Sequence, residues 1–197
     1  MRNVPRSAGL VFLAWCAVGC ADPGRAVDPA ASAVRSGIAA APSAMVSAGP
    51  NTRLVTLMDA CDSTSFNAAV GPGTCSRAGG LNFTQFIDLL SAHQSVGAWQ
   101  NDPSQTNARL GQALIAVNRG GEVHTFTRVA EFGGGIVPLL NQLTGNTTVA
   151  PECLALPPQE FVAPGGTDTE SLDETGVIRF QCCIHPWMRT TVRVRGS

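Results

Sequence analysis

The sequence contains no lysine, only three histidines, and nearly equal numbers of basic and acidic side chains. Its 13 basic residues are all arginine and are balanced by 14 acidic ones, so the formal net charge is −1. A protein that binds nucleic acid usually presents a strongly basic face. Such a face is not expected here, so no nucleic-acid partner is predicted.

A long apolar run is also lacking. Residues 10–19 form an apolar stretch of about ten residues, which is too short to span a bilayer but typical of a signal peptide, and two arginines precede it. The segment AVGC, residues 17–20, resembles the cleavage box of bacterial lipoproteins. This implies that residues 1–20 are removed as a signal peptide up to Cys20, which becomes the lipidated first residue of the mature protein. Ordinary cleavage near Ala21, with Cys20 discarded, is the alternative.

Either form of cleavage predicts an exported protein, in the periplasm or at the cell surface, and the lipid would tether it to a membrane. Residues 21–51 consist mainly of Ala, Pro, Ser, Gly and Val and contain no aromatic residue, so they cannot bury enough surface to fold. They are predicted to be a disordered tether. Residues 52–197 then form the folded domain, in a compartment that permits disulfides.

Cys61 and Cys75 bracket a loop that contains Gly-Pro-Gly. In an exported protein the pair is predicted to form a disulfide, and closing a loop of about fifteen residues contributes roughly 3 kcal/mol. A pair of metal ligands is the alternative, but no histidine lies nearby.

Residues 81–96, LNFTQFIDLLSAHQSV, predict a helix. Phe83, Phe86 and Leu90 belong to one apolar stripe, and Asn82 with Gln85 three residues later forms a capping box. His93, at the end of this helix, is interpreted as a solvated residue beside the helix dipole and not as a ligand.

The rest of the domain reads as short strands separated by Gly and Pro. The expected strands have no alternation with helices, which favours an antiparallel β-sandwich or barrel. A short helical turn is expected at residues 138–143, and the helix and disulfide loop at about 60–97 are expected to be an insertion. The predicted strands are residues 53–59, 112–118, 123–130, 174–183 and 189–195.

A cluster of soft ligands lies near the C-terminus, where Cys182, His185 and Met188 follow the pattern C-x-x-H-x-x-M between two predicted strands. A thiolate, an imidazole and a thioether suit copper that changes between Cu(I) and Cu(II). One more imidazole is needed, and His124 is the only other histidine within a predicted strand. Zinc would compete for such a site, but it would leave Met188 without a role.

This pattern resembles the copper loop of the cupredoxins, the blue-copper proteins, and amicyanin-like sequences in particular, in which Arg also follows the Met. The resemblance covers about residues 100–194 and includes Asn118, six residues before His124. It implies an all-β, Greek-key β-sandwich that binds one copper ion through His124, Cys182 and His185, with Met188 as a long axial ligand. It also implies that Asn118 binds neighbouring backbone and steadies the Cys182 loop.

Two adjacent cysteines compete for the role of ligand. Cys182 has the family's spacing to His185, and neighbours on an extended segment point to opposite faces, so Cys183 is predicted to be buried or bridged. Cys153 is the remaining candidate partner, which predicts a second disulfide, Cys153–Cys183.

The resemblance implies electron transfer between redox proteins outside the cytoplasm, with no catalysis by the protein alone. In the family the imidazole of the loop histidine reaches the surface through an apolar patch where a partner docks. Residues 132–138, with Pro186 and Trp187, are the expected patch, and Pro186 restricts the backbone after His185. Trp187 is interpreted as packing beside the loop and not as an electron relay. The alternatives are a copper carrier or buffer without redox traffic, and a tethered interaction domain.

Overall fold

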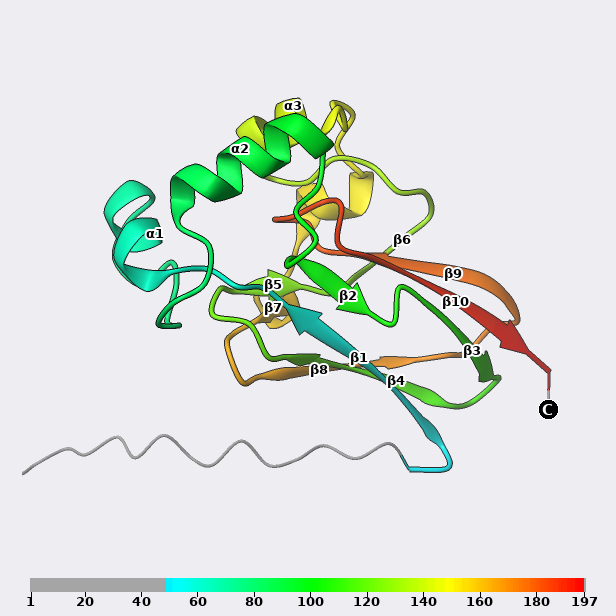
Figure 1. Ribbon diagram of the computed structural model, residues 1–197. Helices are drawn as coiled ribbons and strands as arrows, with labels where there is room; N and C mark the ends of the chain where they lie inside the picture. The colour runs from blue at the N-terminus through cyan, green and yellow to red at the C-terminus, as the bar shows by residue number, and fades with distance from the viewer. Residues whose placement is uncertain (1–48, 197) are drawn as a thin grey trace, which may run out of the picture. The chain divides into compact units, whose positions relative to one another are not determined.

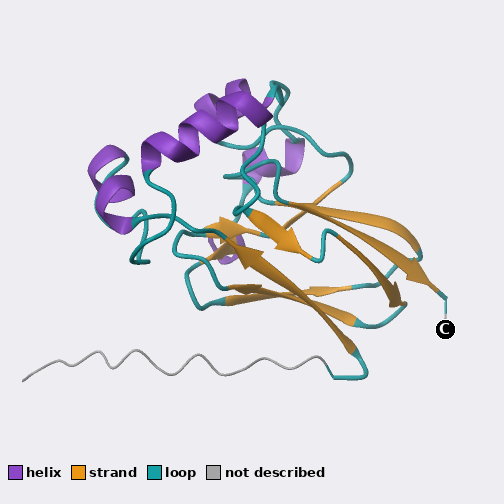
Figure 2. Ribbon diagram, in the orientation of Figure 1, coloured by secondary structure: helices purple, strands orange, loops and turns teal. Residues whose placement is uncertain are grey.

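The computed structural model describes residues 49–196, and strands predominate in this part of the chain (Figure 2). The predicted signal peptide, Cys20 and nearly all of the predicted tether lie outside it. The described elements are, in order, β1 (Thr52–Met58), α1 (Ser63–Ala69), α2 (Phe83–His93), β2 (Gln100–Asp102), β3 (Gln105–Arg109), β4 (Ala113–Asn118), β5 (His124–Thr125), β6 (Thr127–Val129), α3 (Pro138–Thr144), η1 (Pro151–Ala155), η2 (Pro158–Glu160), β7 (Phe161–Val162), β8 (Thr167–Ser171), β9 (Gly176–Gln181) and β10 (Arg189–Arg195).

Two four-stranded sheets form a β-sandwich, with strand orders β2-β1-β4-β8 and β3-β10-β9-β6 (Figure 1). This confirms the sandwich predicted from the sequence. The sheets are mixed, however, because β1 pairs with β4 and β3 with β10 in parallel, whereas an antiparallel arrangement was expected. A long crossover that contains α1 and α2 separates β1 from β4, and such connections allow parallel pairing.

The core lies between the sheets and follows the alternation of side chains along the strands. Every second residue is buried in the central strands, and Phe126 stacks on Phe180 with ring centroids 4.5 Å apart. The inward side chains come from both sheets and are Val55, Leu57, Leu114, Ala116, Ile178, Phe180, Val192 and Val194.

The segment between β1 and β2 forms a helical layer beside one end of the sandwich (Figure 1). The capping box of Asn82 and Gln85 is present at the start of α2, as predicted. A helix that was not predicted, α1, lies inside the disulfide loop and is capped by Asp62, which accepts from the backbone N–H of Ser65. Phe66 on α1 packs against Phe86 on α2 and thereby joins the two helices.

The strand predicted at residues 123–130 is two strands. β5 pairs with β7 and β6 pairs with β9, so the chain changes partner at Phe126, which is fully buried. The strand predicted at residues 189–195 is confirmed as β10, and α3 confirms the helical turn predicted at residues 138–143.

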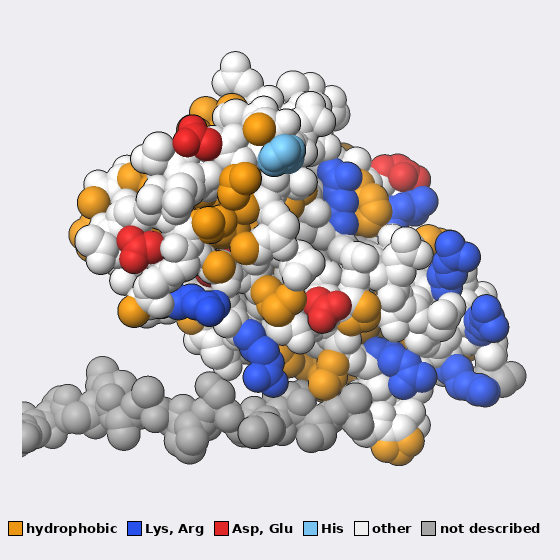
Figure 3. Space-filling view, viewed as in Figure 1, with side chains coloured by type: hydrophobic (Ala, Val, Ile, Leu, Met, Phe, Trp, Pro, Cys, Tyr) orange, Lys and Arg blue, Asp and Glu red, His pale blue; other side chains and the backbone are white. Residues whose placement is uncertain are grey.

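The surface in Figure 3 is divided between charge and apolar side chains. Arginines lie mainly over the strands, and hydrophobic side chains gather beneath α2. Within residues 49–196, no helix combines the length and the apolar character needed to cross a bilayer.

Candidate metal centre

Three of the predicted ligands lie together at one end of the sandwich. His124 begins β5, Cys182 follows β9, and His185 lies in the loop before β10. Cys182 Sγ is 3.8 Å from His124 Nδ1 and 3.9 Å from His185 Nδ1. All three side chains are buried, and one donor atom of each lies within 4.8 Å of the others. The fold thus brings together residues that are 58 positions apart in the chain.

The fourth predicted ligand, Met188, is fully buried and closes the loop. Its backbone N–H donates to the carbonyl of His185, and its carbonyl accepts from the N–H of Cys182, both at 2.9 Å. The flanking strands pair directly, with Arg189 opposite Gln181. The C-x-x-H-x-x-M segment is therefore a tight turn whose ends the β9–β10 ladder holds.

The Cys182 thiol lies in surroundings that favour a thiolate. The backbone N–H groups of Thr125 and His185 both donate to Sγ at 3.4 Å. Burial alone would raise the pKa of Cys182, but the His124 and His185 imidazoles lower it well below its usual value. Each imidazole directs Nδ1 at this one sulfur, so the two rings and the sulfur share a single focus.

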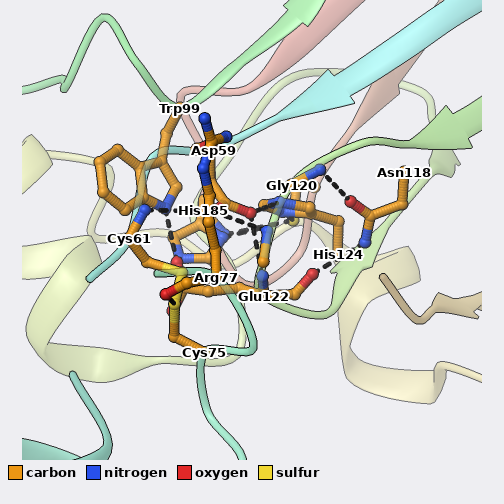
Figure 4. A network of polar contacts seen from close by, with 12 residues as sticks. Asp59, Cys61, Cys75, Arg77, Trp99, Asn118, Gly120, Glu122, His124 and His185 are labelled. Carbon is orange, nitrogen blue, oxygen red and sulfur yellow. Dashed lines mark hydrogen bonds and ion pairs between the residues drawn. A yellow bond between two sulfur atoms is a disulfide. The ribbon is translucent and has the colours of Figure 1, made fainter. Parts of the chain in front are cut away.

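The far side of His124 is held by Asp59, a residue that sequence analysis did not assign to the site. His124 Nε2 and Asp59 Oδ2 are 2.9 Å apart, and both side chains are buried (Figure 4). The Asp59 carboxylate also accepts from the backbone N–H groups of Cys61, Gly121 and Glu122. Asp59 immediately follows β1, 65 positions from His124, and no spacing rule in the sequence connects the two.

These contacts set the charge states of the pair. Burial would raise the pKa of Asp59, but the hydrogen bond to His124 and the backbone donors hold it below its usual range. Burial opposes a charge on His124, yet Asp59 and Cys182 raise its pKa to about 9. A carboxylate that accepts from the outer nitrogen fixes the orientation of a ligand histidine and the nitrogen that it presents.

His185 does not reach the surface as the resemblance implied. It is 3% exposed, and the rings of Phe86 and Trp187 cover it, with centroids 6.4 and 5.4 Å from the imidazole. Its Nε2 lies 3.6 Å from Glu122 Oε2, which in turn accepts from Trp99 Nε1 at 2.6 Å. Burial raises the pKa of Glu122, although the nearby His185 and Trp99 lower it in part.

The predicted docking patch is also not formed as expected. Pro186 is buried, and its carbonyl accepts from Arg189 Nε at 2.7 Å. Gly135, in the glycine run of residues 133–135, lies so close to the loop that a Cβ would overlap the carbonyl of Cys183. This run thus packs against the cysteine loop, whereas Ile136 beside it is 41% exposed.

Asn118 binds backbone, but on the histidine side of the site. Its Nδ2 donates to the carbonyls of Glu122 and Val162, both at 2.8 Å, and its Oδ1 accepts from the N–H of Gly120. Within the described residues it makes no hydrogen bond to the Cys182 loop. Asn118 therefore steadies the turn that leads to His124.

The other cysteines pair away from the focus. The structure contains the disulfides Cys61–Cys75 and Cys153–Cys183 and leaves Cys182 as the free thiol of the described residues. Cys182 and Cys183 point in different directions, as the extended backbone requires. His93, the third histidine, is exposed at the end of α2.

The donor set fits copper. A buried thiol of lowered pKa, two imidazole nitrogens and an adjacent thioether are the combination that mononuclear copper sites use. A hard cation such as Mg²⁺ or Ca²⁺ prefers oxygen ligands, which the focus itself lacks among the described residues.

No family model matches the sequence, and no curated protein does. Three solved structures are similar in fold. The purple cupredoxin from Nitrosopumilus maritimus matches 72% of this chain and 98% of its own at 14% identity and a TM-score of 0.40. A mutant of amicyanin in its reduced state matches 51% and 78% at 17% identity and a TM-score of 0.34. Plastocyanin from Dryopteris crassirhizoma matches 51% and 93% at 15% identity and a TM-score of 0.34.

All three neighbours are cupredoxins, and this chain has a mostly β, two-sheet sandwich. The likeness is remote in both identity and TM-score, so it concerns the fold alone. The function has to follow from the residues of the site.

Proposed function

We propose that the protein is a mononuclear blue-copper protein that carries single electrons between redox partners outside the cytoplasm. One observation carries the proposal: His124 Nδ1, His185 Nδ1 and Cys182 Sγ converge within 4.8 Å in a buried site. His124, Cys182 and His185 would bind the ion, and the thioether of Met188 would be its axial ligand. Bound copper would supply reversible one-electron chemistry, and no catalysis by the protein alone is proposed.

The chain's contribution is to keep these donors still. The β9–β10 ladder fixes both ends of the cysteine loop, Asp59 fixes His124, and two backbone N–H groups bind the Cys182 sulfur. A site that is rigid before the metal changes charge needs little rearrangement during electron transfer, and burial together with the axial ligand sets the potential.

The partner is proposed to be a redox protein that docks transiently over the loop near His185, with the small interface typical of electron exchange. Since His185 is covered, the partner would meet the half-buried Trp187, whose ring edge lies against the imidazole. Two disulfides support an oxidising, extracytoplasmic location. Attachment to a membrane through Cys20 and the tether of residues 21–51 completes this proposal.

The test separates an electron carrier from a copper carrier. The full chain is loaded with one equivalent of copper and examined by voltammetry and by competition with a copper chelator. An electron carrier gives a reversible one-electron wave and retains its metal through repeated cycles, because its buried donors do not rearrange. Irreversible waves with rapid loss of copper to the chelator would support the carrier or buffer instead.

A further inference from the structure

A second feature lies on the other side of His185, where a pocket of about 350 Å³ opens between α1, α2 and α3. Its floor contains the buried side chains of Glu122 and His185. Its walls are apolar and largely aromatic, and they include Phe66, Phe83, Phe86, Ile87, Leu140 and Ile184. The volume and lining are those of a small-molecule site, which typically measures ~300–1,000 Å³ and has few polar groups.

Glu122 gives the pocket a specific polar end. It is 6% exposed and is the one acidic residue in the lining. Its Oε2 accepts from Trp99 Nε1, whereas Oε1 has no hydrogen-bond partner within residues 49–196. A buried carboxylate oxygen without a donor is costly, so a ligand that supplies an O–H group gains from this position.

The mouth of the pocket is also apolar. Val70, which follows α1, is 59% exposed, and Leu139 on α3 is 52% exposed. Both residues line the pocket. Exposed apolar side chains that surround a concave site are typical of ligand entry.

We propose that this pocket binds a small aromatic molecule with a hydroxyl group, of the phenol or hydroquinone class. The ring lies between Phe66, Phe86 and Leu140, and the hydroxyl donates a hydrogen bond to Glu122 Oε1. The proposal goes beyond electron transport and does not require the metal. It places the ligand in contact with His185, since the same pocket reaches both residues.

The chemistry of the lining narrows the class. A carboxylate repels an anionic ligand, and an apolar molecule without a donor leaves Oε1 unpaired. A protein helix, about 10 Å wide with its side chains, is too large for the pocket. An uncharged aromatic ring with one donor satisfies both the walls and the floor.

The experiment measures binding by calorimetry to the full chain, with and without copper, using 4-ethylphenol and its methyl ether, 4-ethylanisole. The two probes have similar rings, but only the phenol donates a hydrogen bond. We expect saturable binding of the phenol, with the ether at least about tenfold weaker because it cannot pair with Glu122. The phenol should bind in both metal states. Equal affinity for the two probes, or no saturation by the phenol, would overturn the proposal.

A variant pair locates the site. Ala69 is an exposed residue of α1 that lines the pocket, and Ala68 is its exposed neighbour outside the lining. Ala69→Trp places an indole at the mouth and should weaken phenol binding at least about tenfold, whereas Ala68→Trp should leave it unchanged. Unchanged binding in Ala69→Trp, with the fold retained by circular dichroism, would place the ligand elsewhere and contradict the proposal.

Discussion

The sandwich and the helical layer treat the candidate metal centre differently. The sandwich positions the donor atoms through its backbone, because strand pairing fixes the ends of the Cys182 loop and Thr125 donates its N–H to the sulfur. The helical layer covers the other side of the centre with side chains, Phe86 from α2 and Trp99 just after it. The comparison teaches that donor geometry depends on strand register, whereas exposure of His185 depends on aromatic packing.

The largest expected effect concerns a matched pair of buried phenylalanines. Phe126, in the sandwich, and Phe66, in the helical layer, are 0% and 1% exposed. Phe126→Ala should lower the free energy of unfolding by about 4 kcal/mol, measured in urea. Phe66→Ala should instead promote local opening of α1 and α2, seen as faster amide hydrogen exchange there while β9 and β10 stay protected. Equal loss of protection in all four elements would show that the two regions are not separable.

Removal of the disulfide in the helical layer ranks next. The variant Cys61→Ala/Cys75→Ala opens a loop with a sequence separation of 14 and should cost about 3 kcal/mol of unfolding free energy. Copper binding by the folded protein should remain, because neither sulfur lies at the focus. A thermal unfolding series with parallel copper titration checks both expectations, and loss of copper binding by a folded variant would link the two regions more closely than proposed.

Asp59 connects the two regions, since it follows β1 and binds both His124 and the turn at Glu122. Asp59→Asn replaces one acceptor oxygen with a donor that faces backbone N–H groups, which should cost about 2 kcal/mol of stability. Copper affinity should fall by roughly 10–100-fold as His124 loses its orienting partner.

The control is Asp62→Asn, at the N-cap of α1, where asparagine caps as well as aspartate. A competition titration with a chelator measures both variants. A similar loss of affinity in Asp62→Asn would deny Asp59 its positioning role.

The smallest effect is expected far from the centre, on β8. Burial, together with the nearby Asp168 and Glu160 carboxylates, raises the pKa of Glu170 to about 7 from its ordinary value of 4.5. The folded state therefore holds more protons than the unfolded state between these values, and stability should fall as pH rises through this window. Glu170→Gln should remove this dependence and stabilise the protein at pH 8 by up to about 1 kcal/mol, given the partial exposure of the site.

Unfolding in urea at about pH 4 and pH 8 tests this prediction, with Asp88→Asn on the exposed side of α2 as the control. No difference between Glu170→Gln and the original protein is expected at about pH 4, where the carboxyl is protonated in the folded state. A gain at the lower pH, or none at the higher one, would contradict the assigned cause.

The sequence predicted the strands that have strong alternation. β10 was predicted over its full length, and the capping box at Asn82 correctly identified the start of α2. The short strands β2, β3 and β8 carry polar sequences such as QND and TDTES, so they offer no apolar period. Their pairing with neighbours, and not their own residues, makes them strands.

The same division applies to the site. The C-x-x-H-x-x-M spacing was enough to group Cys182 with His185, because a tight turn keeps close neighbours together. Asp59 and Glu122 were not predicted, since their roles arise from long-range packing that no local pattern encodes. Burial of His185 was missed for the same reason, because it depends on helices from a distant segment.

The most direct test is the visible spectrum of the copper-loaded protein and of two variants, Cys182→Ser and Cys153→Ser/Cys183→Ser. The protein and the double variant should show an intense blue thiolate-to-copper band, and Cys182→Ser, with its fold retained, should show none. A band that survives in Cys182→Ser, or disappears in a folded double variant, would contradict the assignment of Cys182 as the copper thiolate.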